Sequence, residues 1–174
     1  KVKFKNYESY LSSLKMKTDL KKFQKKDMDR ITQLINKTNQ FNLTLKRVNL
    51  EEVVSISKDS NFLTISGNLE DKFGDNGLIT LLIGKIKNQT IDIVIWLMSC
   101  RVFNRNLEFA LFDHLIYSCQ NKGISTIYGN YVKGKKNFIV KDFYKTLDFK
   151  KVKNKWEYKI TKKYIKKNKI IKII

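Results

Sequence analysis

The sequence has few of the residues that build metal sites and disulfide frameworks. Its 174 residues include one histidine and two cysteines, Cys100 and Cys119, which lie far apart along the chain. Zinc ligands occur as clusters of Cys and His, and small secreted domains carry several paired cysteines. We therefore expect no metal in this domain, and a chain that works in the reducing cytoplasm.

Long hydrophobic runs are absent as well. The two longest, 78–83 and 93–98, are far shorter than the roughly 20 residues that a membrane-spanning helix needs. The lysine-rich N-terminus leads into no apolar signal-peptide core. With 42% hydrophobic and 12% aromatic residues the chain can instead form a globular core. Its length suits one domain that buries about 70% of its unfolded surface.

Arginine is scarce although the chain is strongly basic. The net charge is +20, from 36 Lys and Arg against 16 Asp and Glu, yet only four of the basic residues are Arg. Proteins that read base edges rely on Arg, because its planar guanidinium pairs with guanine. We therefore disfavour specific nucleic-acid binding. Two interpretations of the charge stay open: a basic surface for an acidic partner, or a lysine-rich composition of the kind that an AT-rich coding sequence produces.

Hydrophobic periodicity and turn residues predict a leading helix or linker over 1–18, one domain over 19–165 and a basic tail over 166–174. The domain is expected to contain strands at 20–24, 61–67, 78–87, 91–99, 124–132 and 155–165, and helices at 27–37, 105–121 and 136–146. A hairpin turn is predicted at Asp75-Asn76-Gly77, because these residues tolerate a positive φ. The order of elements predicts an α/β fold in which helices flank a mixed central sheet.

The stretch "WLMSCRVFNRNLE" at 96–108 is the main candidate for chemistry, because an apolar strand stops there and a helix starts after a loop rich in Asn and Arg. A helix N-terminus offers unpaired N–H groups and a partial positive charge, which suit a phosphate. Arg101 and Arg105 are candidates for holding that phosphate, and an ion pair between Arg105 and Glu108 is the alternative. Cys100 is a candidate nucleophile toward an acyl phosphate or thioester, and an inert buried thiol is the alternative. Glu108 is a candidate general base.

A dense cluster of amides, "KTNQFN", follows the helix predicted at 27–37. Asn39, Gln40 and Asn42 supply more amides than helix capping requires, so we expect them to hydrogen-bond a substrate; caps and turns are the alternative. The lone His114 lies at the edge of an apolar helical stripe and is given no role.

The order of elements and two motifs resemble the GNAT (N-acetyltransferase-like) fold. Its pyrophosphate loop is written Arg/Gln-x-x-Gly-x-Gly/Ala after the fourth strand, and the same slot here reads "RVFNRN" (101–106), with Asn104 and Asn106 in place of the glycines. Further on, Asn137 and "YKTLDF" (144–149) resemble the Asn…Tyr-x-x-Leu-Gly-Phe end of that fold, with Asp in place of Gly.

The resemblance implies CoA, or the phosphopantetheine of a carrier protein, as the cofactor. It also implies that Tyr144 protonates a leaving thiolate, with a packed core tyrosine as the alternative, and that the amide cluster borders the acceptor pocket. The cofactor contacts that it implies are Arg101, Asn104, Arg105, Asn106 and Asn137.

Four blocks look more similar still to one group, the C-terminal domain of FkbH-like proteins. They are "INKTNQFNLT" (35–44), "DKFGDNGLI" (71–79), "WLMSCRV" (96–102) with Glu108, and "KNFIVKDFYKTLDF" (136–149). This resemblance implies loading of a glyceryl-type unit from a glycolytic acyl phosphate onto an acyl carrier protein, with a cysteine as the covalent way-station. It also implies a HAD-like phosphatase domain upstream as a partner. The chain departs from the family's glycines at Asn104 and Asn106, and has Asn130 where Glu is usual.

Three functions therefore stay open. The first is a GNAT-like acyltransferase that passes a glyceryl-type acyl group to the phosphopantetheine thiol of an acyl carrier protein. The second is a module that docks the carrier protein without catalysis, and the third is an N-acetyltransferase that depends on acetyl-CoA.

Overall fold

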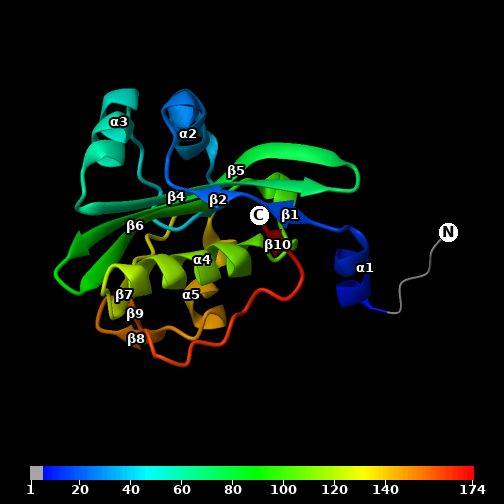
Figure 1. The fold of residues 1–174 in the computed structure, drawn as a ribbon. Coiled ribbons are helices and arrows are strands. Elements are labelled where there is room, and N and C mark those ends of the chain that lie inside the picture. Colours follow the sequence, from blue (N-terminus) through cyan, green and yellow to red (C-terminus); the bar gives the residue numbers. More distant parts are fainter. Residues whose placement is uncertain (1–5) are drawn as a thin grey trace.

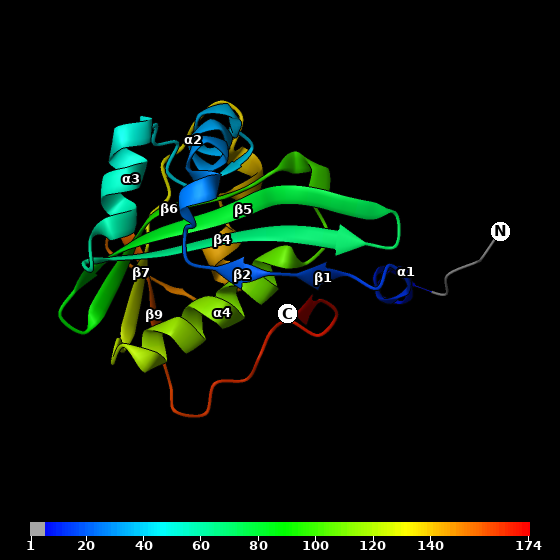
Figure 2. The same cartoon turned by 45° about the horizontal axis from the view of Figure 1, so that its top comes forward.

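A mixed β-sheet forms the centre of the molecule in the computed structural model, which describes residues 6–174 (Figure 1). Its strand order is β10-β1-β4-β5-β6-β7-β9-β8, with β2 paired to β4 and β3 paired to β6. Helices α2 and α3 cover one face of this sheet, and α4 and α5 lie on the other (Figures 1 and 2). The predicted α/β fold, a mixed sheet flanked by helices, is confirmed.

The strands differ widely in length, and the three longest form the middle of the sheet. They are β1 (Lys17–Thr18), β2 (Leu20–Lys21), β3 (Phe41–Asn42), β4 (Phe62–Asp71), β5 (Gly74–Lys87), β6 (Thr90–Met98), β7 (Thr126–Gly129), β8 (Lys150–Val152), β9 (Lys155–Lys159) and β10 (Lys172–Ile173).

The helices are α helices or single 3-10 turns. They are α1 (Tyr7–Ser13), η1 (Lys25–Asp27), α2 (Met28–Lys37), α3 (Leu50–Lys58), η2 (Cys100–Val102), α4 (Leu107–Asn121), η3 (Phe138–Val140) and α5 (Phe143–Thr146). None of the helices within residues 6–174 has the length and the apolar composition to cross a membrane.

Two hydrophobic clusters pack against the two faces of the sheet, as expected for strands that are buried on both sides. The register between β5 and β6 shifts so that Val94 is an extra residue, a β-bulge. Ile93 and Trp96 consequently both face the α4 side, a spacing that a regular strand does not allow. The bulge therefore points the Trp96 indole into the aromatic core above α4.

The long elements in the middle of the chain confirm the sequence predictions for the helices at 27–37 and 105–121 and for the strands of β4, β5 and β6. The hairpin turn, however, was placed wrongly. Asp71 pairs with Gly74, so the turn lies at Lys72 and Phe73, and Asp75 already pairs in β5. Gly77 does have a positive φ of 68°, but at an irregularity within the strand.

Helix α3 was not predicted, although the sequence contains a signal for it. Asn49 and Glu52 form a capping box: the Asn49 side chain accepts from the Glu52 N–H at 2.8 Å, and the Glu52 carboxylate accepts from the Asn49 N–H at 2.7 Å. The spacing Asn-x-x-Glu before an apolar pattern is the signature of such a box.

The C-terminal third is more broken than predicted. The single helix expected at 136–146 is η3 followed by α5, the strand expected at 124–132 is only β7, and the strand expected at 155–165 ends with β9. The tail at 166–174 ends in β10, which pairs in parallel with β1. Of the leading segment, α1 lies within the predicted range, and residues 1–5 fall outside the described part of the chain.

Candidate functional site

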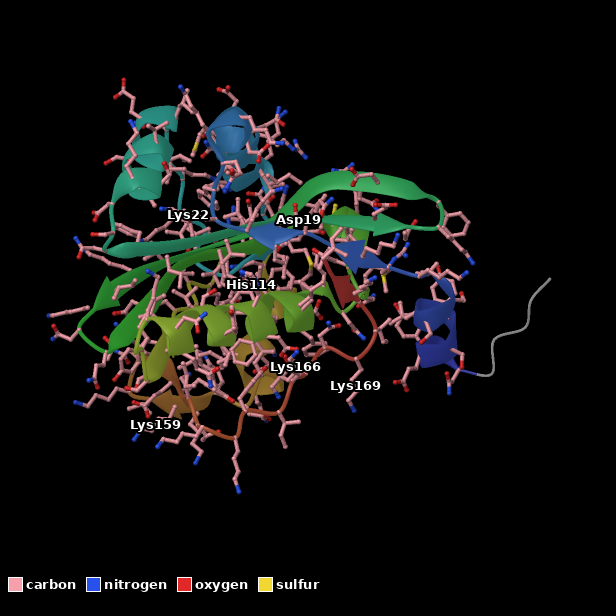
Figure 3. All side chains as sticks on the ribbon, viewed as in Figure 1. Asp19, Lys22, His114, Lys159, Lys166 and Lys169 are labelled. Carbon is pink, nitrogen blue, oxygen red and sulfur yellow. The ribbon has the colours of Figure 1, made fainter. Side chains whose placement is uncertain are left out.

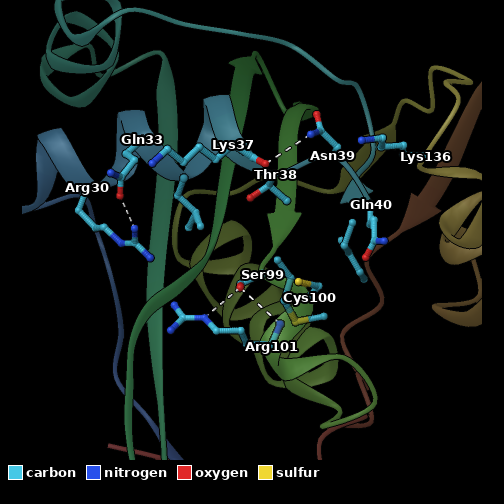
Figure 4. A pocket seen from close by; sticks show the side chains of 13 residues that line it. Arg30, Gln33, Lys37, Thr38, Asn39, Gln40, Ser99, Cys100, Arg101 and Lys136 are labelled. Carbon is cyan, nitrogen blue, oxygen red and sulfur yellow. Dashed lines mark hydrogen bonds between the residues drawn. The ribbon is translucent and has the colours of Figure 1, made fainter.

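A pocket of about 390 Å³ lies at the end of β6, between α2 on one side and η2 on the other (Figure 4). It brings together Cys100 and Arg101 from η2 with Asn39 and Gln40 from the loop after α2, two segments that the sequence analysis singled out separately. The lining residues are Arg30, Gln33, Leu34, Lys37, Thr38, Asn39, Gln40, Phe41, Met98, Ser99, Cys100, Arg101 and Lys136.

Local hydrogen bonds explain why Cys100 faces outward. The Ser99 N–H still donates to the Ile79 carbonyl of β5 at 2.8 Å, and the chain then turns, with the Val102 N–H donating to the Ser99 carbonyl at 3.2 Å. This 3-10 turn buries Val102 and leaves Cys100 exposed at the pocket. Cys119 is fully buried in α4, and burial raises the pKa of its thiol to about 12. The accessible thiol is therefore Cys100.

The pocket is lined by four cations, Arg30, Lys37, Arg101 and Lys136, and by no carboxylate. Within residues 6–174 none of these four forms an ion pair. Arg101 is held by Ser99, whose hydroxyl accepts from the Arg101 Nε at 3.4 Å, and Arg30 donates to Gln33 and to the Leu78 carbonyl. Unpaired cations around one opening favour a negatively charged ligand.

Arg47, which was not predicted from the sequence, fixes the loop that carries the amides. Its guanidinium donates to the Ile35 carbonyl at 2.6 Å, to the Thr38 carbonyl at 3.2 Å and to the Asn39 side chain. The last carbonyls of a helix have no partner within the helix, so an Arg shortly after a helix end was the available signal. Polar residues at helical spacing along α2, Arg30, Gln33 and Lys37, were a second missed signal.

Two predicted amides do not line the pocket but tie its loops together. The Asn42 side chain is fully buried, donates to the Thr38 carbonyl at 3.1 Å and accepts from the Leu45 N–H at 2.9 Å. Asn137 is also fully buried; it donates to the Asn42 carbonyl at 2.8 Å. Both amides position the segment that carries Asn39 and Gln40.

The loop before α4 has the backbone conformation that glycines would supply. Asn104 and Asn106 have positive φ angles of 62° and 63°. Arg105, however, pairs with Asp71 of the β4–β5 hairpin at 3.1 Å, and not with Glu108. The Tyr7 hydroxyl of α1 donates to the Asn104 carbonyl at 2.5 Å. This loop is thus tied to two neighbouring elements.

Glu108 and Tyr144 also lie away from the residues that line the pocket. Glu108 is in the first turn of α4, its Oε2 is buried without a hydrogen-bond partner among residues 6–174, and burial raises the pKa of its carboxyl. Tyr144 is fully buried among aromatic rings, with Phe149 at 5.0 Å and Trp96 at 6.5 Å between ring centroids. Burial raises the pKa of the Tyr144 hydroxyl as well.

We expect Glu108→Gln to stabilise the chain at neutral pH by about 1 kcal/mol, because it replaces a desolvated carboxylate with a neutral amide. The Glu108 pKa is higher in the folded state, so its favourable contribution is present below its ordinary value of 4.5 and is lost as the pH rises through the folded pKa. In urea unfolding between acid and neutral pH, the free energy of unfolding of the variant should increase relative to that of the wild type as the pH rises. A constant difference across that range would contradict the prediction.

Within residues 6–174 no group of three or more His, Cys, Asp or Glu side chains is placed to hold a metal ion. A scan against protein-family models gave no match, and a search of curated proteins gave none either.

Solved structures, in contrast, are similar over most of this chain. The ribosomal-protein-S18-alanine N-acetyltransferase of Escherichia coli matches with a TM-score of 0.63 at 12% identity, over 83% of this chain and 94% of that one. An acetyltransferase of the GNAT family from Staphylococcus aureus Mu50 matches with a TM-score of 0.62 at 12% identity, over 83% and 99%. The fold is that of the GNAT acetyltransferases. A third GNAT-fold structure, the PaiA N-acetyltransferase of Thermoplasma acidophilum in complex with coenzyme A, matches with a TM-score of 0.56 at 14% identity, over 82% and 98%.

Proposed function

We propose that this chain is a GNAT-like acyltransferase in which Cys100 carries the acyl group. It transfers a glyceryl-type acyl unit to the phosphopantetheine thiol of an acyl carrier protein. The observation that carries this proposal is the pocket at the end of β6, where an exposed thiol, unpaired cations and two amides converge. The GNAT fold and the resemblance to FkbH-like proteins support it.

The chemistry that the pocket suits is transfer from an acyl phosphate through a thioester. The Cys100 thiol loses its proton to water, and the thiolate attacks the acyl carbon. The C–S bond forms, and the C–O bond to the phosphate breaks, so that the phosphate leaves with the electron pair. Arg30 and Arg101 stabilise the charge on the leaving phosphate, and the amides of Asn39 and Gln40 orient the acyl unit. The pantetheine thiolate then attacks the thioester and frees Cys100.

Charge supports an acidic carrier protein as the partner. Carrier proteins are typically acidic, and opposite charges steer the encounter of two proteins. Besides the cations of the pocket, the C-terminal segment is rich in exposed lysines, such as Lys159, Lys166 and Lys169, which lie on the α4 side of the sheet (Figure 3). We propose in addition that a HAD-like domain works together with this one, as the resemblance implies.

The test is intact-protein mass spectrometry after incubation with a glycolytic acyl phosphate, with and without an added HAD-like partner domain. We expect an adduct of glyceryl mass that a free thiol removes, and transfer of that mass to a phosphopantetheinylated carrier protein. Cys100→Ser should abolish both. Cys119→Ser is the matched control and should leave both intact, because Cys119 is fully buried.

Two results would replace this proposal. If the carrier protein binds both wild type and Cys100→Ser equally and no adduct forms with the partner domain present, the chain is a docking module. Transfer of an acetyl group from acetyl-CoA to an amine, independent of Cys100, would make it an N-acetyltransferase. The similarity to N-acetyltransferase structures favours that second candidate over the docking module.

A further inference from the structure

Strands β6 and β7 are parallel but pair over a short stretch only. The pairing runs from Thr90 with Thr126 to Asp92 with Tyr128, while β6 continues to Met98. In α/β sheets, ligands bind in the crevice outside the carboxyl ends of neighbouring strands, at the point where the strand order switches. An extended ligand in this crevice could add to β6 like a strand, through main-chain hydrogen bonds.

A segment of the chain itself fills this place. We call residues 41–44 the wedge; they comprise β3 and the two residues that follow it. The wedge pairs with the far end of β6, and its Leu43 N–H donates to the Trp96 carbonyl at 3.1 Å. The Thr44 hydroxyl donates to the Val94 carbonyl at 2.7 Å. The Val94 and Trp96 carbonyls, which lie beyond the β6–β7 ladder, therefore already have partners.

The other side of the wedge is bonded to the loop that follows β7. The Val132 N–H donates to the Leu43 carbonyl at 2.8 Å, and the Asn137 side chain donates to the Asn42 carbonyl at 2.8 Å. The Asn130 side chain spans the crevice directly and donates to the Ile93 carbonyl at 3.1 Å. All four wedge residues are buried. The crevice is thus closed from both sides.

We infer that the wedge stands in for an extended thioester arm along β6, so that a pantetheine arm reaches Cys100 through the pocket between α2 and η2 instead. The inference rests on the proposed function, because this pantetheine arm is the acceptor in that function. The residues of the crevice do not fit coenzyme A in the extended position. Phe41 belongs both to the wedge and to the pocket wall, so the wedge separates the crevice from the thiol.

The wedge also sets a preference between the two entry routes. An arm in the crevice has to displace the wedge first, so its affinity is multiplied by the fraction of molecules in the open state and is lowered accordingly. An arm that enters the pocket displaces nothing. Free CoA and a carrier-bound arm have the same pantetheine chain, so the wedge directs both of them to the pocket.

The test places a pantetheine arm at Cys100 and measures where it lies. Pantethine, the disulfide of pantetheine, loads the thiol: the Cys100 thiolate attacks one sulfur, a new S–S bond forms, and one pantetheine thiolate leaves and takes a proton from water. Hydrogen exchange of loaded and unloaded protein is then compared. We expect the Leu43 and Val132 amides to stay protected, and the amides of Asn39 and Gln40 to exchange more slowly after loading.

A pair of variants provides a second, independent measurement. Thr44→Val removes the wedge hydroxyl bond, and Thr90→Val removes a similar bond, from Thr90 to the Lys87 carbonyl at 2.8 Å, outside the wedge. We expect Thr44→Val to speed exchange at Leu43 about fivefold, the factor typical of one hydrogen bond, and Thr90→Val to leave it unchanged. Neither variant should change the rate at which pantethine loads Cys100.

Three results would overturn the inference: loss of Leu43 protection on loading, faster loading in Thr44→Val than in Thr90→Val, or no loading of the exposed Cys100. Each is read without any acyl transfer. Failure of the acyl adduct to form on Cys100, with the arm nevertheless seated in the pocket, would refute the proposed function and leave the wedge inference standing.

Discussion

Replacing Asn137 by alanine should lower the free energy of unfolding by about 3–5 kcal/mol. The side chain is fully buried, accepts from the Gly134 N–H at 2.8 Å, and donates to the carbonyls of Asn42 and Val132 at 2.8 and 2.9 Å. Alanine leaves these three backbone groups without their partner in the interior, and each buried group left unsatisfied costs about 1–3 kcal/mol. Urea unfolding followed by circular dichroism measures the change.

Asn36→Ala is the matched control for this substitution. Asn36 also makes two bonds to a backbone, donating to and accepting from Val48 at 2.7 and 3.3 Å, but it is exposed. Water replaces such bonds, so we expect a loss of about 1 kcal/mol or less. Equal losses in the two variants would show that burial of Asn137 contributes nothing special. A large loss confined to Asn137→Ala would show that this asparagine holds the two loops together.

Asp113→Ala should have the second-largest effect, a loss of about 3 kcal/mol together with release of the C-terminal tail. The Asp113 carboxylate is buried and accepts from the Tyr164 hydroxyl at 2.5 Å and from the N–H groups of Lys167 and Asn168 at 2.9 and 3.0 Å. Bonds to a charged acceptor are worth about 1.5–3 kcal/mol each, and part of that is regained when water reaches the freed groups. Unfolding measurements and hydrogen exchange across 160–174 test both parts.

Asp148→Asn separates charge from burial in the same region, because asparagine removes the charge and tolerates the positive φ of 64° at this position. Its carboxylate pairs with Lys167 at 2.5 Å, but the side chain is 76% exposed. Exposed ion pairs contribute about 0–1 kcal/mol. We therefore expect this variant to keep the tail protected from exchange. A tail that is released equally by Asp148→Asn would refute the anchoring role of Asp113.

The long elements were predictable because their periodicity is unambiguous, whereas the short ones depend on tertiary contacts. The apolar runs of β5 and β6 allowed no reading other than buried strands. The wedge has no such pattern, since its pairing with β6 joins residues more than fifty positions apart, and "QFNLT" resembles a loop. In the same way, Asp75-Asn76-Gly77 carries the residues of a turn, but the register between β4 and β5 places the turn before it.

The residues of the candidate site also differ in whether local sequence or tertiary contacts determine their place. Cys100, Arg101, Asn39 and Gln40 were predicted from local sequence, and the structure brings them to one pocket. Lys136 was missed because it joins the site only through packing of the loop before η3, whereas Arg30 stands at helical spacing with Gln33 and Lys37 along α2, a signal that was available. Asn137 was predicted from a motif as a cofactor contact, and its bonds hold the wedge. A motif gives the position of a residue in a fold, and the hydrogen bonds give the group it contacts.

The two outer strands of the sheet carry a consequence for the solubility of the chain. β10 and β8 have two and three residues, and both contain lysine. Short edge strands with lysine side chains resist pairing with the edges of other molecules, because such pairing would bring like charges together and offers few hydrogen bonds. The lysines of β8 and β10, which are part of the +20 charge, thus oppose edge-to-edge pairing between the sheets of different molecules. An acidic partner or high salt that screens these lysines weakens that protection, so concentrated stocks of this chain are best kept at low ionic strength.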